Sequence, residues 1–523
     1  MPQHTFTISF PDIPVSINVA PHTTVLEAEI AAGLHPDAPC GGRGTCGKCK
    51  VRVLSGRESL RMQGKPLPPE TWLPACQLTV EGDAAVALPS ARESRILTTG
   101  AGPANEAAPA EGAFFAVAAF DVGTTSVVGY LLDGRTGRQL AVDSRLNPQT
   151  QFGADVVARG SYAMEHGVDA LRDVIRQALE EMLGNLAAKA SLDRREIRRV
   201  SIVGNTCMHH LFLSYSPGPL MVAPYMPEHR AAEVRPAAQL GLTIAPDGEV
   251  WILPCIAGFV GADTVGCLLA SDWSRREPLT LMIDIGTNGE MVLGNRHRSI
   301  TCSTAAGPAF EGAKIRCGMR GADGAIDHVF LQEDGSIGFS VVGGGKAEGL
   351  CGSGLLDAVA VLLDQGILTY SGRMKSAGFP QAGLVDNQPA YFFTGNVFLT
   401  QADIREVQLA KGAIAAGIQL LCTHLGVSID DIDQVLIAGA FGNYMSPDSA
   451  CRIGLLPQAL RPKIQMIGNA AGEGAKLAVL HPEQYALATT LSNEVTFLEL
   501  ANDPSFQDIF VDSLFFEGES EED

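Results

Sequence analysis

The sequence predicts an α/β protein with a small N-terminal α+β module, and three observations lead to this prediction. Residues 5–10 ("TFTISF") and 15–20 ("VSINVA") alternate apolar and polar side chains, as the two strands of a hairpin do. Residues 90–113 have little periodicity and are rich in Ala, Gly, Pro and Glu, which is typical of a flexible linker. The chain that follows contains an internal repeat in which strands and helices alternate.

The internal repeat consists of two pairs of matching segments. "FDVGTTS" at 120–126 matches "IDIGTNG" at 283–289, and "IRRVSIVG" at 197–204 matches "IDQVLIAG" at 432–439. Each member of the second pair follows a stretch with apolar residues at helical spacing. The spacing between the landmarks is longer in the second half, which predicts an insertion there. Two related α/β halves that face each other would place both Asp–x–Gly–Thr turns at one cleft.

These patterns divide the chain into five segments. The module covers residues 1–89, the flexible linker 90–113, the first repeat half 114–280, the second half 281–501, and a C-terminal segment with an acidic tail 502–523. We interpret the acidic tail, "FEGESEED", as a solvated end without a specific role.

Composition and charge exclude several classes of protein. A formal net charge of -20 argues against a nucleic-acid binder, which would need a basic patch. The most apolar stretch, residues 251–270, is interrupted by a proline and several glycines, so we expect no membrane span. No charged n-region with an apolar h-region opens the chain, so we expect no signal peptide. With 12 cysteines and no such signal, reduced thiols in a cytoplasmic protein are expected.

Four cysteines form the clearest local pattern. Cys40, Cys46 and Cys49 have C-x5-C-x2-C spacing on a glycine-rich loop, and Cys76 follows in "ACQ". Four thiolates suit a structural zinc ion or an iron–sulfur cluster. Zinc sites usually pair their ligands in short C-x2–4-C knuckles, which Cys76 lacks, so the pattern favours a 2Fe–2S cluster. Glycine lets the backbone N–H groups turn toward the cluster sulfurs.

Residues 1–88 resemble the plant- and adrenodoxin-type ferredoxins in their "GxCGxC" and "ACQ" features. The resemblance implies a β-grasp 2Fe–2S domain that uses the four cysteines as ligands. The first spacing is one residue longer than the plant-type C-x4-C, as it also is in the adrenodoxin type.

The two Asp–x–Gly–Thr turns suit phosphate chemistry. An Asp at the end of a strand offers a carboxylate to a hydrated Mg²⁺ ion, and the Gly–Thr turn offers N–H and hydroxyl donors to phosphate oxygens. No Walker-type loop is present, which fits a nucleotide site of another type. Structural turns that only join strands are the alternative interpretation.

The duplicated turns, followed by "LIAGAFGNYM" at 436–445, resemble the superfamily of acetate and sugar kinases, Hsp70 and actin. That resemblance implies two facing ribonuclease-H-like halves with ATP and Mg²⁺ in the cleft. It assigns the catalytic carboxylates and the nucleotide-binding residues as follows: Asp121 and Asp284 as the carboxylates, Gly123, Thr124 and Thr125 in the first phosphate loop, Gly286, Thr287 and Asn288 in the second, and Gly439 and Gly442 near the adenosine.

Other polar residues allow more than one interpretation. The glycine-rich stretches 305–321 and 342–357 are interpreted as loops that line the same cleft, and Glu311 and Lys314 in the first could contact phosphate. A purely structural role fits these loops equally well. His209 and His210 are adjacent and so do not share a helix face, which favours packing or hydrogen bonding over metal ligation.

The whole chain resembles the reductive activators of corrinoid proteins, and "STAAGPAFEGAKI", "GNTCMHHLF" and "GFVGADT" carry this resemblance. It implies a homodimeric, ATP-hydrolysing activase that returns an inactive cobalt(II) corrinoid protein to cobalt(I) for a methyltransferase. An upstream reductase or ferredoxin would supply the electron. Some relatives have an extra domain between the ferredoxin and ATPase parts, and here only the linker stands between them.

Three other functions stay open at the level of the sequence. An ATP-dependent activator of a radical dehydratase or a benzoyl-type reductase would have a similar ATPase part, but such activators lack an N-terminal ferredoxin. A small-molecule kinase with a redox module would need a catalytic base and a substrate pocket, and neither is evident. A nucleotide-binding redox sensor would need only the two binding sites.

Overall fold

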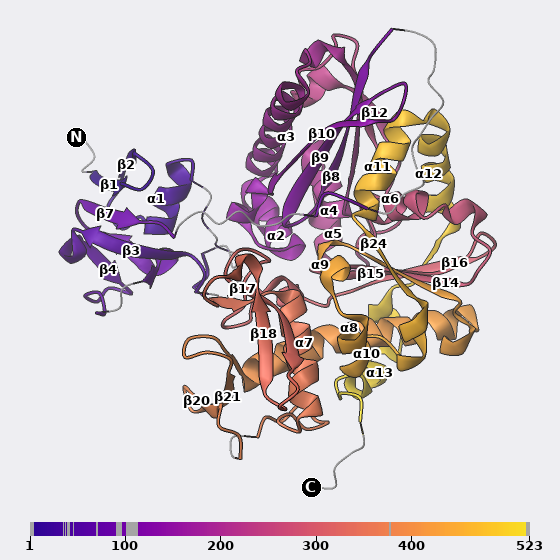
Figure 1. The fold of residues 1–523 in the computed structure, drawn as a ribbon. Helices are drawn as coiled ribbons and strands as arrows, with labels where there is room; N and C mark the ends of the chain where they lie inside the picture. Colours follow the sequence, from indigo (N-terminus) through magenta and orange to yellow (C-terminus); the bar gives the residue numbers. More distant parts are fainter. Residues whose placement is uncertain are drawn as a thin grey trace.

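The computed structural model describes residues 5–34, 36, 38, 42–44, 47–69, 72–89, 97–100, 113–375 and 378–518 (Figure 1). Its N-terminal module is a five-stranded sheet in the order β2-β1-β7-β3-β5, with a separate β4–β6 pair and one helix, α1. The predicted hairpin is confirmed, because β1 and β2 pair antiparallel. The elements are β1 (Phe6–Phe10), β2 (Val15–Val19), α1 (Val25–Ala31), β3 (Lys50–Ser55), β4 (Leu60–Met62), β5 (Leu73–Pro74), β6 (Leu78–Val80) and β7 (Ala84–Ala87).

Helix α1 covers the sheet of the module because its ends and its apolar face are well defined. Thr24 and Glu27 form a capping box at its start, and Gly33, with φ +75°, lies just past its end. Val25, Leu26 and Ala28 are buried against strands of the module. This arrangement is the predicted α+β module.

The first repeat half is a six-stranded sheet in the order β10-β9-β8-β11-β13-β12. β8, β9 and β10 pair antiparallel, whereas β11 runs parallel to both β8 and β13. The apolar positions at helical spacing in α3 are buried, as the sequence predicts. The elements are β8 (Ala116–Val122), β9 (Ser126–Asp133), β10 (Gln139–Leu146), α2 (Val156–His166), α3 (Asp169–Ala190), β11 (Ile197–Gly204), α4 (Thr206–Leu213), α5 (Gly218–Met221), β12 (Glu233–Pro236), β13 (Glu249–Ile252) and α6 (Ala262–Ala270).

Five strands of the second half repeat the order and directions of five strands of the first, which confirms the duplication, and the sixth strand lies at the opposite edge. Its sheet has the order β24-β23-β14-β15-β16-β25, with β14, β15 and β16 antiparallel and β14, β23 and β24 parallel. The elements are β14 (Thr280–Ile285), β15 (Gly289–Gly294), β16 (Ser299–Thr304), α8 (Gln401–Leu425), β23 (Gln434–Ala438), α9 (Ala440–Tyr444), α10 (Pro447–Arg452), β24 (Ile464–Gly468), α11 (Ala470–Leu480), α12 (Pro482–Glu494), β25 (Thr496–Phe497) and α13 (Phe506–Asp512).

The longer spacing in the second half has a structural cause. Two additional three-stranded sheets and one helix lie between β16 and α8 in the chain, and the sheet that contains β17 is the nearer of the two to the N-terminal module in Figure 1. They are built from β17 (Ala325–Leu331), β18 (Ile337–Val341), β19 (Gly349–Leu350), α7 (Gly352–Asp364), β20 (Ala382–Val385), β21 (Gln388–Phe392) and β22 (Phe398–Thr400).

The two halves meet through helices α6 and α11, which share one apolar core with both sheets. Their backbones approach so closely that a Cβ at Gly474 would lie 2.0 Å from the carbonyl oxygen of Gly266, and a Cβ at Gly266 would lie 2.8 Å from that of Ala471. Glycine at these positions therefore allows the close contact. The contact holds the ends of β8 and β14 opposite each other.

The predicted flexible linker is only partly described by the structure. Residues 97–100 pack on the second half: Gly100 forms an isolated bridge with Gly468, and Leu97 is buried. The expectation of a linker that is flexible throughout residues 90–113 is therefore wrong at these four residues, because backbone hydrogen bonding and apolar burial hold them. Residues 90–96 and 101–112 lie outside the described residues.

Within the described part of the chain, no helix combines the length and apolar character needed to cross a membrane.

Candidate functional site

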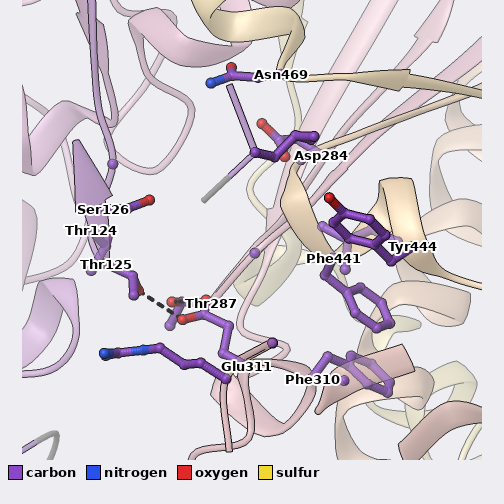
Figure 2. A pocket seen from close by; sticks show the side chains of 18 of the residues that line it. Thr124, Thr125, Ser126, Asp284, Thr287, Phe310, Glu311, Phe441, Tyr444 and Asn469 are labelled. Carbon is purple, nitrogen blue, oxygen red and sulfur yellow. Dashed lines mark hydrogen bonds between the residues drawn. The ribbon is translucent and has the colours of Figure 1, made fainter. Parts of the chain in front are cut away.

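A cleft of about 380 Å³ lies between the two halves, and both predicted phosphate turns open into it (Figure 2). The first turn connects β8 to β9, and the second connects β14 to β15. Nine of the ten residues predicted for the nucleotide site line the cleft: Asp121, Gly123, Thr124, Thr125, Asp284, Gly286, Thr287, Asn288 and Gly439. The repeat thus places its two turns as expected, at the same edge of two facing sheets.

Gly439 and Gly442 differ in their surroundings. Gly439 has φ +89°, and a Cβ there would lie 2.5 Å from Oδ1 of Asp284, so its backbone lies directly against that carboxylate. Gly442 is not among the residues that line the cleft. A Cβ at Gly442 would lie 2.4 Å from Cγ2 of Ile437, so this glycine allows α9 to pack on β23.

The first phosphate turn is held by side chains from several elements. The N–H of Gly123 donates to the carbonyl of Ser126 at 2.9 Å, and Nδ2 of Asn147 donates to the carbonyl of Gly123 at 2.8 Å. Nδ2 of Asn205 donates to Oγ1 of Thr124 at 2.8 Å. The fully buried Arg159 also donates to the carbonyl oxygen of Thr124. These contacts fix the turn before any ligand binds.

Glu311 connects the two phosphate turns. Oγ1 of Thr125 donates to its Oε2 at 2.7 Å (dashed in Figure 2), and Oγ1 of Thr287 donates to its Oε1 at 2.6 Å. The sequence suggested both Glu311 and Lys314 as phosphate contacts. Lys314 instead is exposed and pairs with Glu406 at 3.6 Å, and it does not line the cleft.

Among the carboxyl groups that line the cleft, those of Asp121, Asp263, Asp284 and Glu290 have raised pKa values. Burial, reinforced by a neighbouring carboxylate in each case, raises the pKa of Asp121, Asp263 and Asp284 to about 7. Burial also raises the pKa of Glu290 well above its usual value. Such a set favours a cation, which would stabilise the ionised forms.

The carboxyl groups do not form a ready-made metal cage. Among the residues that the structure describes, no three His, Cys, Asp or Glu side chains are close enough together to hold a metal ion. Mg²⁺ usually keeps several waters and binds one or two carboxylates together with substrate phosphates. The arrangement therefore fits a Mg²⁺ ion that arrives with a nucleotide and contacts the carboxylates through water.

Asn469 links the second half to the first phosphate turn and to the linker. Its Nδ2 donates to Oδ2 of Asp121 at 3.0 Å, and its backbone N–H donates to the carbonyl of Thr99 at 3.0 Å. Leu97, which precedes Thr99 by two residues, lines the cleft between the two halves. Sequence reasoning missed Asn469, although Asn205 and Asn469 both follow a glycine at the end of a strand and cap the next helix.

An aromatic wall closes one side of the cleft (Figure 2). The rings of Phe310 and Phe441 stack with centroids 4.8 Å apart and planes 10° from parallel, and Tyr444 is half exposed beside them. Flat aromatic faces suit a purine base. The motif "LIAGAFGNYM" contains two of these three residues, but the pattern alone did not single them out.

The cysteine loop has the local structure that an iron–sulfur ligand loop needs. Gly42, Gly44 and Gly47 all have positive φ, at +81°, +75° and +64°. The N–H of Ala75 donates to the carbonyl of Cys49 at 2.6 Å, which brings the segments of Cys49 and Cys76 together. Both cysteines are free of disulfides. Cys40 and Cys46 lie outside the described residues, so the four-ligand set stays a prediction that the described loop fits.

His209 and His210 are both buried on helix α4. Nδ1 of His210 lies 2.8 Å from the carbonyl oxygen of Thr206, and burial lowers the pKa of His209 to about 3. Burial also lowers the pKa of His210. Both imidazole rings are therefore uncharged near neutral pH, which is consistent with a packing role.

Three family models match the chain in the order of its segments. The model described as "2Fe-2S iron-sulfur cluster binding domain" matches residues 10–81. "RACo middle region" matches residues 116–276, and "C-terminal domain of RACo the ASKHA domain" matches residues 278–523.

Individual relatives agree with these models. The chain is 39% identical over 416 residues to "Corrinoid activation enzyme RamQ" of Eubacterium limosum, covering 76% of this chain and 70% of the relative. It is 26% identical over 430 residues to a "[Co(II) methylated amine-specific corrinoid protein] reductase" of Methanosarcina barkeri, covering 76% of each. A solved "Reductive activator for corrinoid,iron-sulfur protein" superposes with TM-score 0.70 at 28% identity, covering 98% of both chains.

Proposed function

We propose that this chain, which belongs to the RACo family of corrinoid activators, is an ATP-dependent reductive activase for a corrinoid protein. The observation that carries the proposal is the union, in one chain, of a 2Fe–2S domain with a two-half nucleotide cleft. The substrate is the inactive cobalt(II) form of a corrinoid protein that serves a methyltransferase. One electron enters from an upstream reductase or ferredoxin and leaves to cobalt, which becomes cobalt(I).

The residues of the cleft would bind Mg-ATP in a defined orientation. The hydroxyls of Thr125 and Thr287, which line the cleft, would donate to the phosphates in place of Glu311. Asp121 and Asp284 would hold the hydration shell of Mg²⁺, which neutralises phosphate charge. Phe310 and Phe441 would contact the base.

The iron–sulfur domain supplies one-electron transfer when its cluster is bound. Cys40, Cys46, Cys49 and Cys76 would hold the cluster, and Gln77 keeps the loop closed by donating from Nε2 to the carbonyl of Gly44 at 3.0 Å. Plant-type 2Fe–2S centres have potentials near about −400 mV. Each 100 mV of unfavourable gap costs about 2.3 kcal/mol per electron. Nucleotide-linked changes in binding can offset a gap of this size.

Three further features are part of the proposal. The activase works as a homodimer, it hydrolyses the ATP that it binds, and it acts in a reduced cytoplasm. The first follows from the family resemblance, the second from the catalytic carboxyl groups, and the third from the cysteine content.

ATP turnover provides the test. The anaerobically purified protein should hydrolyse Mg-ATP slowly alone and faster with a cobalt(II) corrinoid protein, because the proposed function couples turnover to that substrate. A small-molecule kinase would instead transfer phosphate to an added acceptor. Turnover that no corrinoid protein changes would remove the support for the activase.

A further inference from the structure

The N-terminal module touches the nucleotide-binding part of the chain through the cysteine loop itself. Nζ of Lys48 donates to the carbonyl oxygens of Ile315 and Gly318, at 3.2 and 2.5 Å. Lys48 directly precedes Cys49, one of the predicted cluster ligands. The contact therefore joins the edge of the cluster site to a loop of the second repeat half.

That loop, residues 312–319, is a compact unit. A Cβ at Gly312 would lie 2.5 Å from the carbonyl oxygen of Met319, and a Cβ at Gly318 would lie 2.3 Å from that of Gly312, so the two ends of the loop are in direct contact. On its far side, Met319 donates its N–H to the carbonyl of Leu350 at 2.8 Å. A displacement at one end of so tight a loop tilts the whole loop rather than bending it locally.

The residue immediately before this loop is Glu311, which accepts hydrogen bonds from Thr125 and Thr287 across the cleft. These hydroxyls belong to the two turns that face the phosphates of the bound nucleotide. A carboxylate on the same hydroxyls competes with phosphate oxygens and repels their charge. Nucleotide and the bridging position of Glu311 therefore exclude each other.

We propose that residues 308–319 are the docking surface of the cysteine loop, and that Glu311 makes this docking depend on nucleotide. Without nucleotide, Glu311 bridges the two phosphate turns and thereby keeps the loop of residues 312–319 in place. In this position, the carbonyl oxygens of that loop accept hydrogen bonds from Lys48. Mg-ATP displaces Glu311, the loop tilts, and the iron–sulfur domain is released to reach the corrinoid partner. This inference rests on the proposed binding of nucleotide in the cleft.

The labelling rate of lysine amines tests the inference in the full-length holoprotein. Lys48 and Lys50 lie two residues apart, and only Lys48 donates to the second half among the described contacts, while Lys50 is an exposed residue of β3. We expect an acetylating N-hydroxysuccinimide ester to modify Lys48 about tenfold more slowly than Lys50. The reason is that the charged amine of Lys48 must first leave its hydrogen bonds before it can react. Mg²⁺ with adenylyl imidodiphosphate should bring the two rates together without changing that of Lys50.

Two variants sharpen the test. Glu311→Ala should label Lys48 at the fast rate even without nucleotide, and Glu311→Gln, which keeps the shape, should give an intermediate rate. Because coupling is reciprocal, Lys48→Met should bind the nucleotide analogue more tightly than the parent, and Lys50→Met should not. The visible absorption of the cluster checks that both Met variants remain loaded.

The outcomes separate the two proposals. If equilibrium dialysis shows no binding of the analogue, the nucleotide site and the inference both fail. If the analogue binds but the ratio of Lys48 to Lys50 labelling stays constant, or Lys48→Met leaves affinity unchanged, the inference alone fails.

Discussion

The amide nitrogen of Asn469 lies 3.0 Å from the carboxylate of Asp121, so a residue at the end of β24 holds an aspartate at the end of β8. The same asparagine caps helix α11 by accepting the N–H of Gly472 at 2.8 Å. One side chain thus connects the two halves at the predicted phosphate site and also stabilises the helix that joins them.

Replacing Asn469 should separate these two roles. Asn469→Ala removes both, and we expect a loss of about 1 kcal/mol of stability from the cap. Mg-ATP affinity should fall roughly tenfold, because a hydrogen bond to a charged group is lost. Asn469→Ser keeps a capping oxygen but is too short to reach Asp121, so it should lose affinity with near-parental stability. Calorimetric binding and thermal unfolding measure the two effects. Parental affinity in both variants would show that the contact has no part in nucleotide binding.

The proposed catalytic carboxyl groups provide a second prediction. Asp121→Asn and Asp284→Asn should each lower ATP turnover by roughly a hundredfold or more, because each removes a charge that faces Mg²⁺. The visible spectrum of the cluster should not change, since the cluster belongs to another domain. Asp143→Asn is the matched control, because Asp143 pairs with Lys189 away from the cleft. If the two cleft variants turned over ATP as the control does, the site would lie elsewhere.

The cysteines predicted to bind the cluster provide a third prediction. Cys49→Ser or Cys76→Ser should lose the 2Fe–2S absorption and most of the iron and sulfide, while nucleotide binding persists. Cys317→Ser serves as a control, because Cys317 is half buried in the second repeat half, and it should retain the cluster. Metal and sulfide analysis of anaerobic protein gives the answer. Zinc in stoichiometric amount in colourless protein would contradict the assignment.

The raised pKa values of the cleft carboxyls predict a dependence on pH. Because the pKa of Asp121, Asp263 and Asp284 is about 7 in the folded protein and 3.8 ordinarily, the folded state binds more protons between these values. Stability without ligand should therefore fall as pH rises from about 4 to about 7. Mg-ATP favours the ionised forms, so its affinity should rise over the same range and level off above. Thermal unfolding across this pH range measures the stability, and binding experiments measure the Mg-ATP affinity. Stability and affinity that do not change with pH would contradict the prediction.

The sequence predicted the fold well where the signal was local or repeated. The alternation in residues 5–10 and 15–20 corresponds to the β1–β2 hairpin, and the paired Asp–x–Gly–Thr motifs form two turns at one cleft. These features follow from periodicity and from duplication, which are visible in one chain.

Contacts between distant segments were not predictable in the same way. Lys48 and Ile315 are 267 residues apart in the sequence, and Asn469 and Asp121 are 348 residues apart. No local sequence pattern can therefore predict either contact. Gly442 was placed near the adenosine by the resemblance of "LIAGAFGNYM" to the superfamily of acetate and sugar kinases, Hsp70 and actin, and a glycine after a strand suits either close approach to a ligand or helix packing. The structure places it against Ile437, where packing needs it.

As an ATP-dependent activase, the protein should transfer an electron to the corrinoid only when nucleotide is bound. Its most direct test is the visible spectrum of a cobalt(II) corrinoid protein under a low-potential reductant, recorded with the activase and with each component omitted in turn. Cobalt(I) should accumulate only when reductant, Mg-ATP, loaded activase and corrinoid protein are all present, and Cys49→Ser activase should not support it. Equal formation of cobalt(I) without ATP, or none with any methyltransferase corrinoid protein, would contradict the proposed function.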